Sequence, residues 1–185
     1  MTIAAPQAFR WTRDMYDRMV DEGILGPHTR VQLIDGEVIE MLPQGSRHAG
    51  VVQLVGEALR KGCPEDAHVR FQLPLALDDH SEPEPELGVV PGVPRDYIKA
   101  HPATALLVVE VAESSLGLDR TRKHRIYACN TIPEYWIVNL AEVALEVHRS
   151  PRGEAYEERR ELKAGATIAP LAWEGAPVAV ADLLP

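Results

Sequence analysis

The fold is decided by residues 106–111, which read Leu-Leu-Val-Val-Glu-Val. A run that is almost entirely apolar and rich in β-branched residues is typical of a central strand covered on both faces of its sheet. Glu110 breaks the pattern, because an unpaired carboxylate at such a position carries a large desolvation cost or takes up a proton. The run leaves two interpretations open. Glu110 is either a structural glutamate paired with a buried arginine or hydroxyl group, or a member of a functional site.

The flanking sequence predicts helices around a mixed sheet. Thr12 is placed to cap one helix, and Ser46 to cap a longer one that ends at Gly62. Between these helices, two β-rich runs at 31–34 and 37–41 are joined by Asp-Gly, a strong hairpin signal. Together with the central run, they predict an α/β (α+β) fold. The other expected elements are strands at 68–77, 87–90, 134–140, 143–149 and 156–162, an exposed loop at 78–85, a helical turn around residue 97 and a helix at 119–129.

Length and composition limit the class of protein. The chain has 185 residues, of which 45% are hydrophobic and 25% charged, close to the average for a soluble globular protein. We expect a single domain over residues 1–185, with residues 1–10 as a disordered segment. No apolar run reaches the roughly 18 residues of a membrane span. No signal peptide is evident, and Cys63 and Cys129 are spaced as free thiols, so we expect a cytoplasmic protein without membrane contact.

Charge is distributed unevenly along the chain. The net charge of −9 excludes broad electrostatic coating of nucleic acid, although it leaves room for a local phosphate site. Lys123, a residue type that is uncommon in this chain, lies among Arg120, Arg122 and Arg125, with Asp119 as the acidic residue of the segment. This segment is either a solvated helix face or a cationic patch beside an active site.

Three glutamates are candidates for one acidic cluster. Glu37 follows the tight turn, Glu86 enters the strand that ends at residue 90, and Glu110 lies in the central run. If neighbouring strands bring them together, two charges ~4 Å apart repel by ~4 kcal/mol at an effective dielectric constant of ~20. A divalent cation removes that repulsion, and a site made only of carboxylates favours Mg²⁺ or Mn²⁺ over Zn²⁺.

A lysine is expected beside this cluster. Strand alternation places Ala112 on the same face as Glu110, which leaves space there for a side chain from another element. Lys123, in the following helix, is the residue expected to extend to that point. Metal-binding carboxylates beside a lysine and arginines are what phosphodiester hydrolysis needs, because the cations offset charge that develops in the transition state.

Six motifs occur in a recognisable order along the chain. They are Leu-Ile-Asp-Gly-Glu at 33–37, Arg-His at 47–48, Gln-Leu-Pro-Leu at 72–75, Ser-Glu-Pro-Glu-Pro-Glu-Leu at 81–87, Val-Val-Glu-Val at 108–111, and the segment from 119 through Ile-Pro-Glu-Tyr-Trp-Ile-Val at 132–138. In this order they resemble the Uma-two family of endonucleases, a branch of the restriction-endonuclease-like PD-(D/E)xK superfamily. The resemblance covers residues 10–185, and its last motif is the most specific.

The resemblance implies a restriction-endonuclease-like mixed β-sheet flanked by helices, and Mg²⁺- or Mn²⁺-dependent cleavage of DNA. Glu37 matches the family's early acidic residue, Glu86 takes the place of the superfamily aspartate, and Glu110 that of the second metal-binding carboxylate. Lys123 matches a catalytic lysine that has moved from the strand to the next helix. Related nucleases often act as dimers, so a homodimer is an expected arrangement. Glutamate in place of the usual aspartate at Glu86 leaves open whether the site is active.

Four further residues are candidates for substrate binding, namely His48, Gln72, Arg120 and Arg122. His48 is also explained as a surface or capping histidine, and Gln72 by hydrogen bonding within the sheet. Two other functions stay open. One is a catalytically weakened nuclease fold that binds a nucleic acid or protein partner. The other is a glycosidase-like hydrolase with a carboxylate pair, although an aromatic content of 5% offers few platforms for sugar rings.

Overall fold

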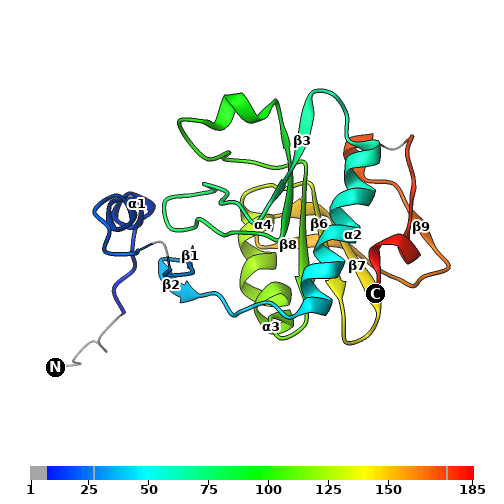
Figure 1. The fold of residues 1–185 in the computed structure, drawn as a ribbon, viewed down its shortest axis with the longest axis horizontal. Helices are drawn as coiled ribbons and strands as arrows, with labels where there is room; N and C mark the ends of the chain where they lie inside the picture. The colour runs from blue at the N-terminus through cyan, green and yellow to red at the C-terminus, as the bar shows by residue number, and fades with distance from the viewer. Residues whose placement is uncertain (1–7, 27, 174) are drawn as a thin grey trace.

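The computed structural model describes residues 8–26, 28–173 and 175–185, which surround a six-stranded sheet (Figure 1). The strand order is β3-β4-β5-β6-β7-β8, in which β5 and β6 are parallel and the other neighbours antiparallel. The predicted mixed sheet flanked by helices is therefore confirmed. The strands are β3 (Ala67–Phe71), β4 (Leu87–Pro91), β5 (Leu107–Ala112), β6 (Glu134–Asn139), β7 (Ala144–Arg152) and β8 (Ala155–Leu162).

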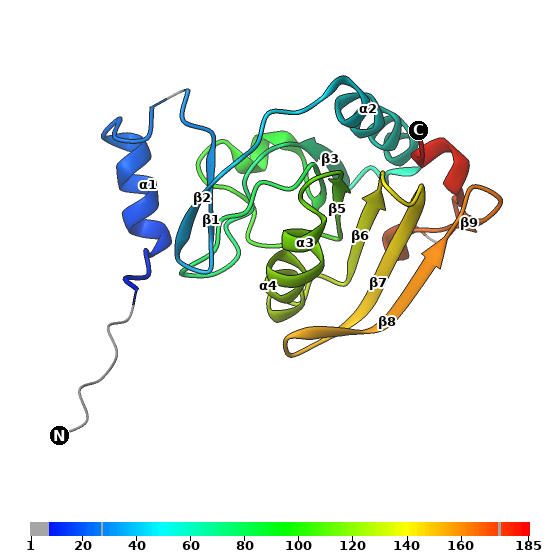
Figure 2. The same cartoon turned by 90° about the horizontal axis from the view of Figure 1, so that it is seen from below.

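Helices cover both faces of the sheet (Figure 2). The long helix α2 (Ser46–Gly62) and the C-terminal segment pack on one face, where Val55, Leu59 and Trp136 belong to one buried apolar cluster. The other face is covered by a continuous helical segment formed by α3 (Leu116–Leu118), the π-helical turn η2 (Asp119–Lys123) and α4 (His124–Cys129). Strand β5 is buried along its whole length, as its apolar sequence predicts.

An N-terminal unit lies at one edge of the molecule (Figures 1 and 2). Thr12 caps α1 (Arg13–Asp21) as predicted, since its side chain accepts a hydrogen bond from the Met15 amide. The predicted hairpin is formed by β1 (Val31–Ile34) and β2 (Glu37–Glu40). Asp35 and Gly36 both have positive φ, the conformation that an Asp-Gly hairpin turn needs. Of residues 1–10, whose disorder was expected, residues 1–7 lie outside the described part of the chain.

Four sequence expectations need correction. The strand expected at 68–77 ends at Phe71 as β3, and residues 73–77 have no regular secondary structure. Ser46 is the first residue of α2 rather than its cap, because Gly45 occupies the cap position and makes no side-chain hydrogen bond. The helix expected at 119–129 begins at residue 116, and its residues 119–123 are π-helical. The segment 78–85 is not an exposed loop. It returns along β1 through a bridge between Leu33 and Glu82, which buries Glu82.

Short elements complete the described structure, and none of its helices combines the length and apolarity needed to cross a membrane. The predicted turn around residue 97 is a 3-10 helix. The short elements are η1 (Pro94–Tyr97), β9 (Thr167–Ile168), η3 (Leu171–Trp173), β10 (Val178–Ala179) and η4 (Val180–Leu183).

Candidate active site

The sheet register aligns three polar side chains on adjacent strands. Phe71 pairs with Leu87, and Leu87 with Val109. The next residue toward the same end of the sheet is Gln72 after β3, Glu86 before β4 and Glu110 in β5. A hydrogen bond of 3.1 Å from the Gln72 amide to the Glu86 carbonyl continues the pairing beyond the strands. The sheet therefore positions both glutamates through its backbone.

Glu110 is buried and receives two donors on a single oxygen. Its Oε1 accepts hydrogen bonds from Lys123 Nζ and from the Tyr127 hydroxyl, both at 2.8 Å. Lys123 and Tyr127 come from η2 and α4, which pack over β5. Burial raises the pKa of Glu110 to about 7, although the Lys123 charge opposes that shift. Lys123, from the helical segment that follows β5, thus reaches Glu110.

Glu86 is contacted by polar side chains from three different segments, of which Gln44 and Gln72 donate hydrogen bonds and His48 makes an ion-pair contact. Gln72 Nε2 lies 2.8 Å from its Oε2 and Gln44 Nε2 lies 3.2 Å from the same oxygen. His48 Nε2 lies 3.3 Å from Oε1 and 2.8 Å from the Val111 carbonyl oxygen. Burial alone would raise the pKa of Glu86, but the polar contacts from His48 and Gln72 outweigh it and hold this pKa below the usual value. The site thus combines a carboxylate whose pKa is lowered, Glu86, with one whose pKa is raised by burial, Glu110.

Asp119 is a member of the site that the sequence did not identify as one. It is 1% exposed, and its Oδ2 accepts a hydrogen bond of 2.6 Å from Ser115 Oγ. Its Oδ1 lies 3.8 Å from Lys123 Nζ and has no hydrogen-bond partner among the described residues. Burial raises the pKa of Asp119 against the charge of Lys123. The spacing of four residues before Lys123 was a usable signal, because such residues share a helix face.

Glu86, Glu110 and Lys123 border a cavity of about 300 Å³, whereas Asp119 lies behind its wall, beside Ser115 and Lys123. Its wall carries five carboxylates and two cations, so the cavity is acidic when no ligand is bound. Met41, Leu42 and Pro43, from the segment between β2 and α2, add an apolar side. The charged residues and the side chains that hold Glu86 are Arg30, Glu40, Gln44, His48, Gln72, Glu84, Glu86, Glu110, Glu113 and Lys123.

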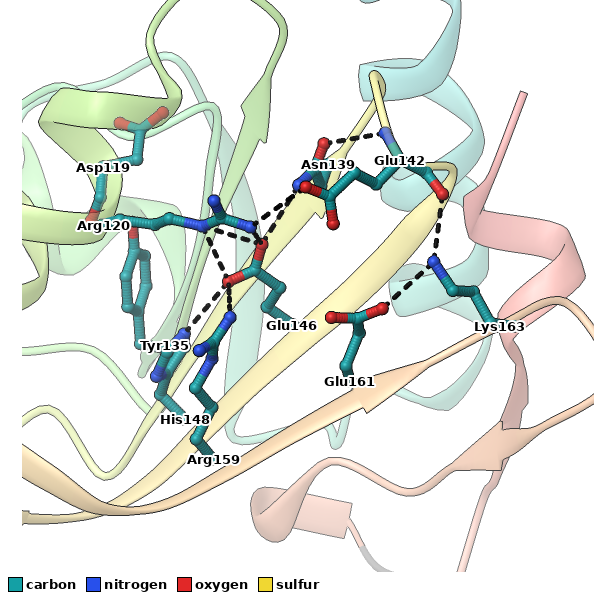
Figure 3. A network of polar contacts seen from close by, with 10 residues as sticks. All are labelled: Asp119, Arg120, Tyr135, Asn139, Glu142, Glu146, His148, Arg159, Glu161 and Lys163. Carbon is teal, nitrogen blue, oxygen red and sulfur yellow. Dashed lines mark hydrogen bonds and ion pairs between the residues drawn. The ribbon is translucent and has the colours of Figure 1, made fainter.

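Three of the predicted site residues do not line this cavity. Glu37 is exposed on β2, and its Oε2 accepts a hydrogen bond of 2.9 Å from Arg122 Nη1. Arg122 also donates to the Ile34 carbonyl, so it ties η2 to the hairpin. Arg120 points toward β7, where both its Nε and its Nη2 donate to the fully buried Glu146 (Figure 3). The arginines next to Lys123 are thus paired with acidic side chains.

The arrangement is compatible with a magnesium ion. No group of three or more His, Cys, Asp or Glu side chains within residues 8–26, 28–173 and 175–185 is grouped closely enough to hold a metal. Magnesium, however, is usually held by one or two carboxylates, with water and substrate phosphate completing its shell. Glu86 and Glu110 offer such a pair, and Oε2 of Glu110 accepts no protein hydrogen bond in the described structure. An oxygen-only donor set suits Mg²⁺ or Mn²⁺.

The mixed sheet flanked by helices is the fold expected of a restriction-endonuclease-like protein, and it places Lys123 of η2 beside Glu110 of β5. The family Uma2, described as "Putative restriction endonuclease", matches residues 13–181, and the chain belongs to this family. The resemblance inferred from the motifs is therefore confirmed.

A solved structure supports the same fold. It is a "putative nuclease belonging to DUF820" from Anabaena variabilis, which is 17% identical to this chain, with a TM-score of 0.69. The match covers 89% of this chain and 96% of that one. The comparison with curated proteins gave no match.

Proposed function

We propose that this protein is a divalent-metal-dependent endonuclease that hydrolyses phosphodiester bonds in DNA. One observation carries the proposal, namely that three side chains converge on a single cavity: Glu86 from the residue before β4, Glu110 from β5 and Lys123 from η2. A metal bound there would polarise a phosphoryl oxygen and lower the pKa of a bound water. Family membership supports a nucleic-acid substrate.

The side chains of the site have separable roles in this proposal. Glu86 and Glu110 would hold the metal. His48 and Gln72 lower the pKa of Glu86 and so favour its ionised form, and Gln44 contacts the same carboxylate and helps to fix its orientation. The ammonium of Lys123, already inside the cavity wall, would offset negative charge on the phosphate as the bond to the leaving oxygen breaks.

The acidic wall has a consequence for binding order. Phosphate oxygens are repelled by a cavity in which carboxylates outnumber cations. We therefore expect DNA to bind weakly to the metal-free protein and more tightly when Ca²⁺ or Mg²⁺ is present. Glu37, Arg120 and Arg122 are paired outside the cavity. We propose that these three residues fix η2 against the hairpin and the sheet.

Cleavage of supercoiled plasmid tests the proposal, because the assay separates nicking from linearisation of a duplex. The wild-type protein should cut with Mg²⁺ or Mn²⁺ and not with EDTA. Lys123→Ala should cleave at least about a hundredfold more slowly, because it lacks a group that stabilises charge in the transition state. It should still bind Mg²⁺. Lys61→Ala, which removes an exposed lysine of α2, is the matched control and should cut normally. Cleavage by Lys123→Ala at the wild-type rate would refute the proposed site.

A binding module without catalysis is the second candidate. Two sets of existing contacts favour it. Gln44, Gln72 and His48 already contact the carboxylate of Glu86. The ammonium of Lys123 is already paired with Glu110. Calorimetry with Mg²⁺ separates the two functions, because a scaffold has no need to bind the ion at millimolar concentration. Absence of binding, with and without DNA, would favour the scaffold.

A further inference from the structure

The ammonium of Lys123 competes with any cation for Glu110. Its Nζ lies 2.8 Å from Glu110 Oε1, and both side chains are almost completely buried. The same oxygen accepts the Tyr127 hydroxyl, so donors already surround one side of this carboxylate. A divalent cation bound to Glu110 would place a second positive charge beside the ammonium in an environment that screens charge poorly. Lys123 then needs another acceptor.

Asp119 provides that acceptor. Its Oδ1 is buried, has no hydrogen-bond partner among the described residues, and lies 3.8 Å from Lys123 Nζ. Ser115 accounts for the other oxygen, Oδ2, but nothing in the described structure satisfies Oδ1. A buried acceptor without a partner is unfavourable and uncommon in folded proteins. The gap of about one ångström between 3.8 Å and a hydrogen bond is within reach of the flexible lysine stem.

The backbone that carries both residues is fixed, so the movement is confined to side chains. The Tyr135 hydroxyl donates to the Asp119 carbonyl at 3.1 Å. Arg120 binds Glu146 on β7 (Figure 3), and Arg122 binds the Ile34 carbonyl. The π-helical turn η2 is therefore held from the sheet and from the hairpin. π-Helical turns often occur at functional sites.

We propose that Asp119 is a positioning residue that receives the Lys123 ammonium when a divalent cation binds Glu110. In the metal-free protein Lys123 neutralises Glu110. With the metal bound, Lys123 pairs with Asp119 Oδ1 and stays at the cavity wall, where it faces the phosphate. This inference rests on the proposed metal site at Glu110, and it adds a step that the metal site alone does not require.

Lysine side-chain NMR tests the exchange of partners, in which the Lys123 ammonium moves from Glu110 to Asp119, without a nuclease assay. The chain has only four lysines, at positions 61, 99, 123 and 163, so ¹³C- and ¹⁵N-labelled lysine gives few signals, and Lys123→Ala identifies the one of interest. Addition of Mg²⁺ to the wild-type protein should shift the Lys123 signals and leave the other three in place. Calorimetry under the same conditions measures Mg²⁺ binding independently.

Variants of Asp119 supply the second measurement. Asp119→Asn should weaken Mg²⁺ binding by about tenfold, the lower end of what loss of a residue behind a metal ligand costs. Asp119→Glu should restore much of the affinity, because it restores the charge. Asp14→Asn, which removes an exposed carboxylate of α1, is the matched control and should bind as the wild type does.

The outcomes separate this inference from the proposed function. If Mg²⁺ binds the wild-type protein but the Lys123 signals do not move, the exchange is refuted while the metal site stands. Unchanged Mg²⁺ affinity in folded Asp119→Asn also refutes it. Absence of Mg²⁺ binding in the wild-type protein would refute both. If Asp119→Asn does not fold, the wild-type titration still decides, because it needs no variant at Asp119.

Discussion

Glu82 offers a prediction whose sign and size follow from the structure. This glutamate is 5% exposed, and its carboxylate has no hydrogen bond or ion pair among the described residues. Burial raises its pKa to about 7, and Asp17 adds to that shift. The folded pKa lies above the unfolded value of 4.5, so Glu82 is compatible with the fold while it is protonated. The contribution of Glu82 to the free energy of unfolding is fully present below pH 4.5 and is lost as the pH rises through 7.

The perturbation that isolates this effect is Glu82→Gln, which keeps the size of the side chain and removes its charge. The rise in the pKa of Glu82 from 4.5 to about 7 limits the stability that Glu82→Gln can gain above pH 7 to about 3 kcal/mol. Relaxation of the segment and residual solvent contact lower this to about 2 kcal/mol. For a chain of this length, that gain raises Tm by about 4 to 8 °C.

Thermal and urea unfolding at pH 5 and pH 8 measure the gain. Glu82→Gln should be more stable than the wild type at pH 8, and the difference should shrink at pH 5, where the wild-type carboxyl is largely protonated. Glu57→Gln, at an exposed position of α2, is the matched control and should change little at either pH. A gain that is absent at pH 8, or larger at pH 5 than at pH 8, would refute the reasoning.

Two further predictions concern the polar network around Glu146 on β7, which Figure 3 shows. Burial lowers the pKa of His148 to about 4, and its buried Nε2 has no hydrogen-bond partner in the described structure, although it lies 3.9 Å from Glu146 Oε2. The pKa of His148 is lower in the folded protein than the unfolded value of 6.5, so His148 destabilises the fold as the pH falls below 6.5. The free energy of unfolding of His148→Phe, measured with urea, should therefore exceed that of the wild type by about 2 kcal/mol at pH 5 and by much less at pH 8. An equal gain at both pH values would instead indicate a packing effect. Arg120→Ala should lose about 2 kcal/mol in the same assay, because buried Glu146 then keeps, among the described residues, only Arg159 and Asn139 as hydrogen-bond donors. An unchanged midpoint would contradict that.

The sequence predicted the parts of the site that depend on local pattern. The apolar run around Glu110 predicted the central strand, and the lysine expected to reach Glu110 from the next helix, Lys123, donates a hydrogen bond to it. The Asp-Gly turn predicted the hairpin. Each of these follows from residues within one strand or turn, or from the helix that comes directly after it.

What the sequence did not predict depends on contacts between distant segments. Glu37 was expected beside Glu110, but the hairpin lies at the edge of the molecule, where Glu37 meets Arg122 instead. Glu82 looked exposed because its neighbours are acidic and proline-rich, yet the segment pairs with β1. Asp119 shares a helix face with Lys123, but the sequence does not show that its carboxylate is buried in a π-helical turn 3.8 Å from Lys123 Nζ.

The central claim is a carboxylate metal site built on β5, and binding of Mg²⁺ and Mn²⁺ by calorimetry tests it most directly. The wild-type protein should bind both ions, and Glu110→Gln, which keeps the shape of the side chain and removes its charge, should abolish binding while the protein stays folded. Wild-type binding that survives in Glu110→Gln, or no binding by the wild type with or without DNA, would contradict the claim.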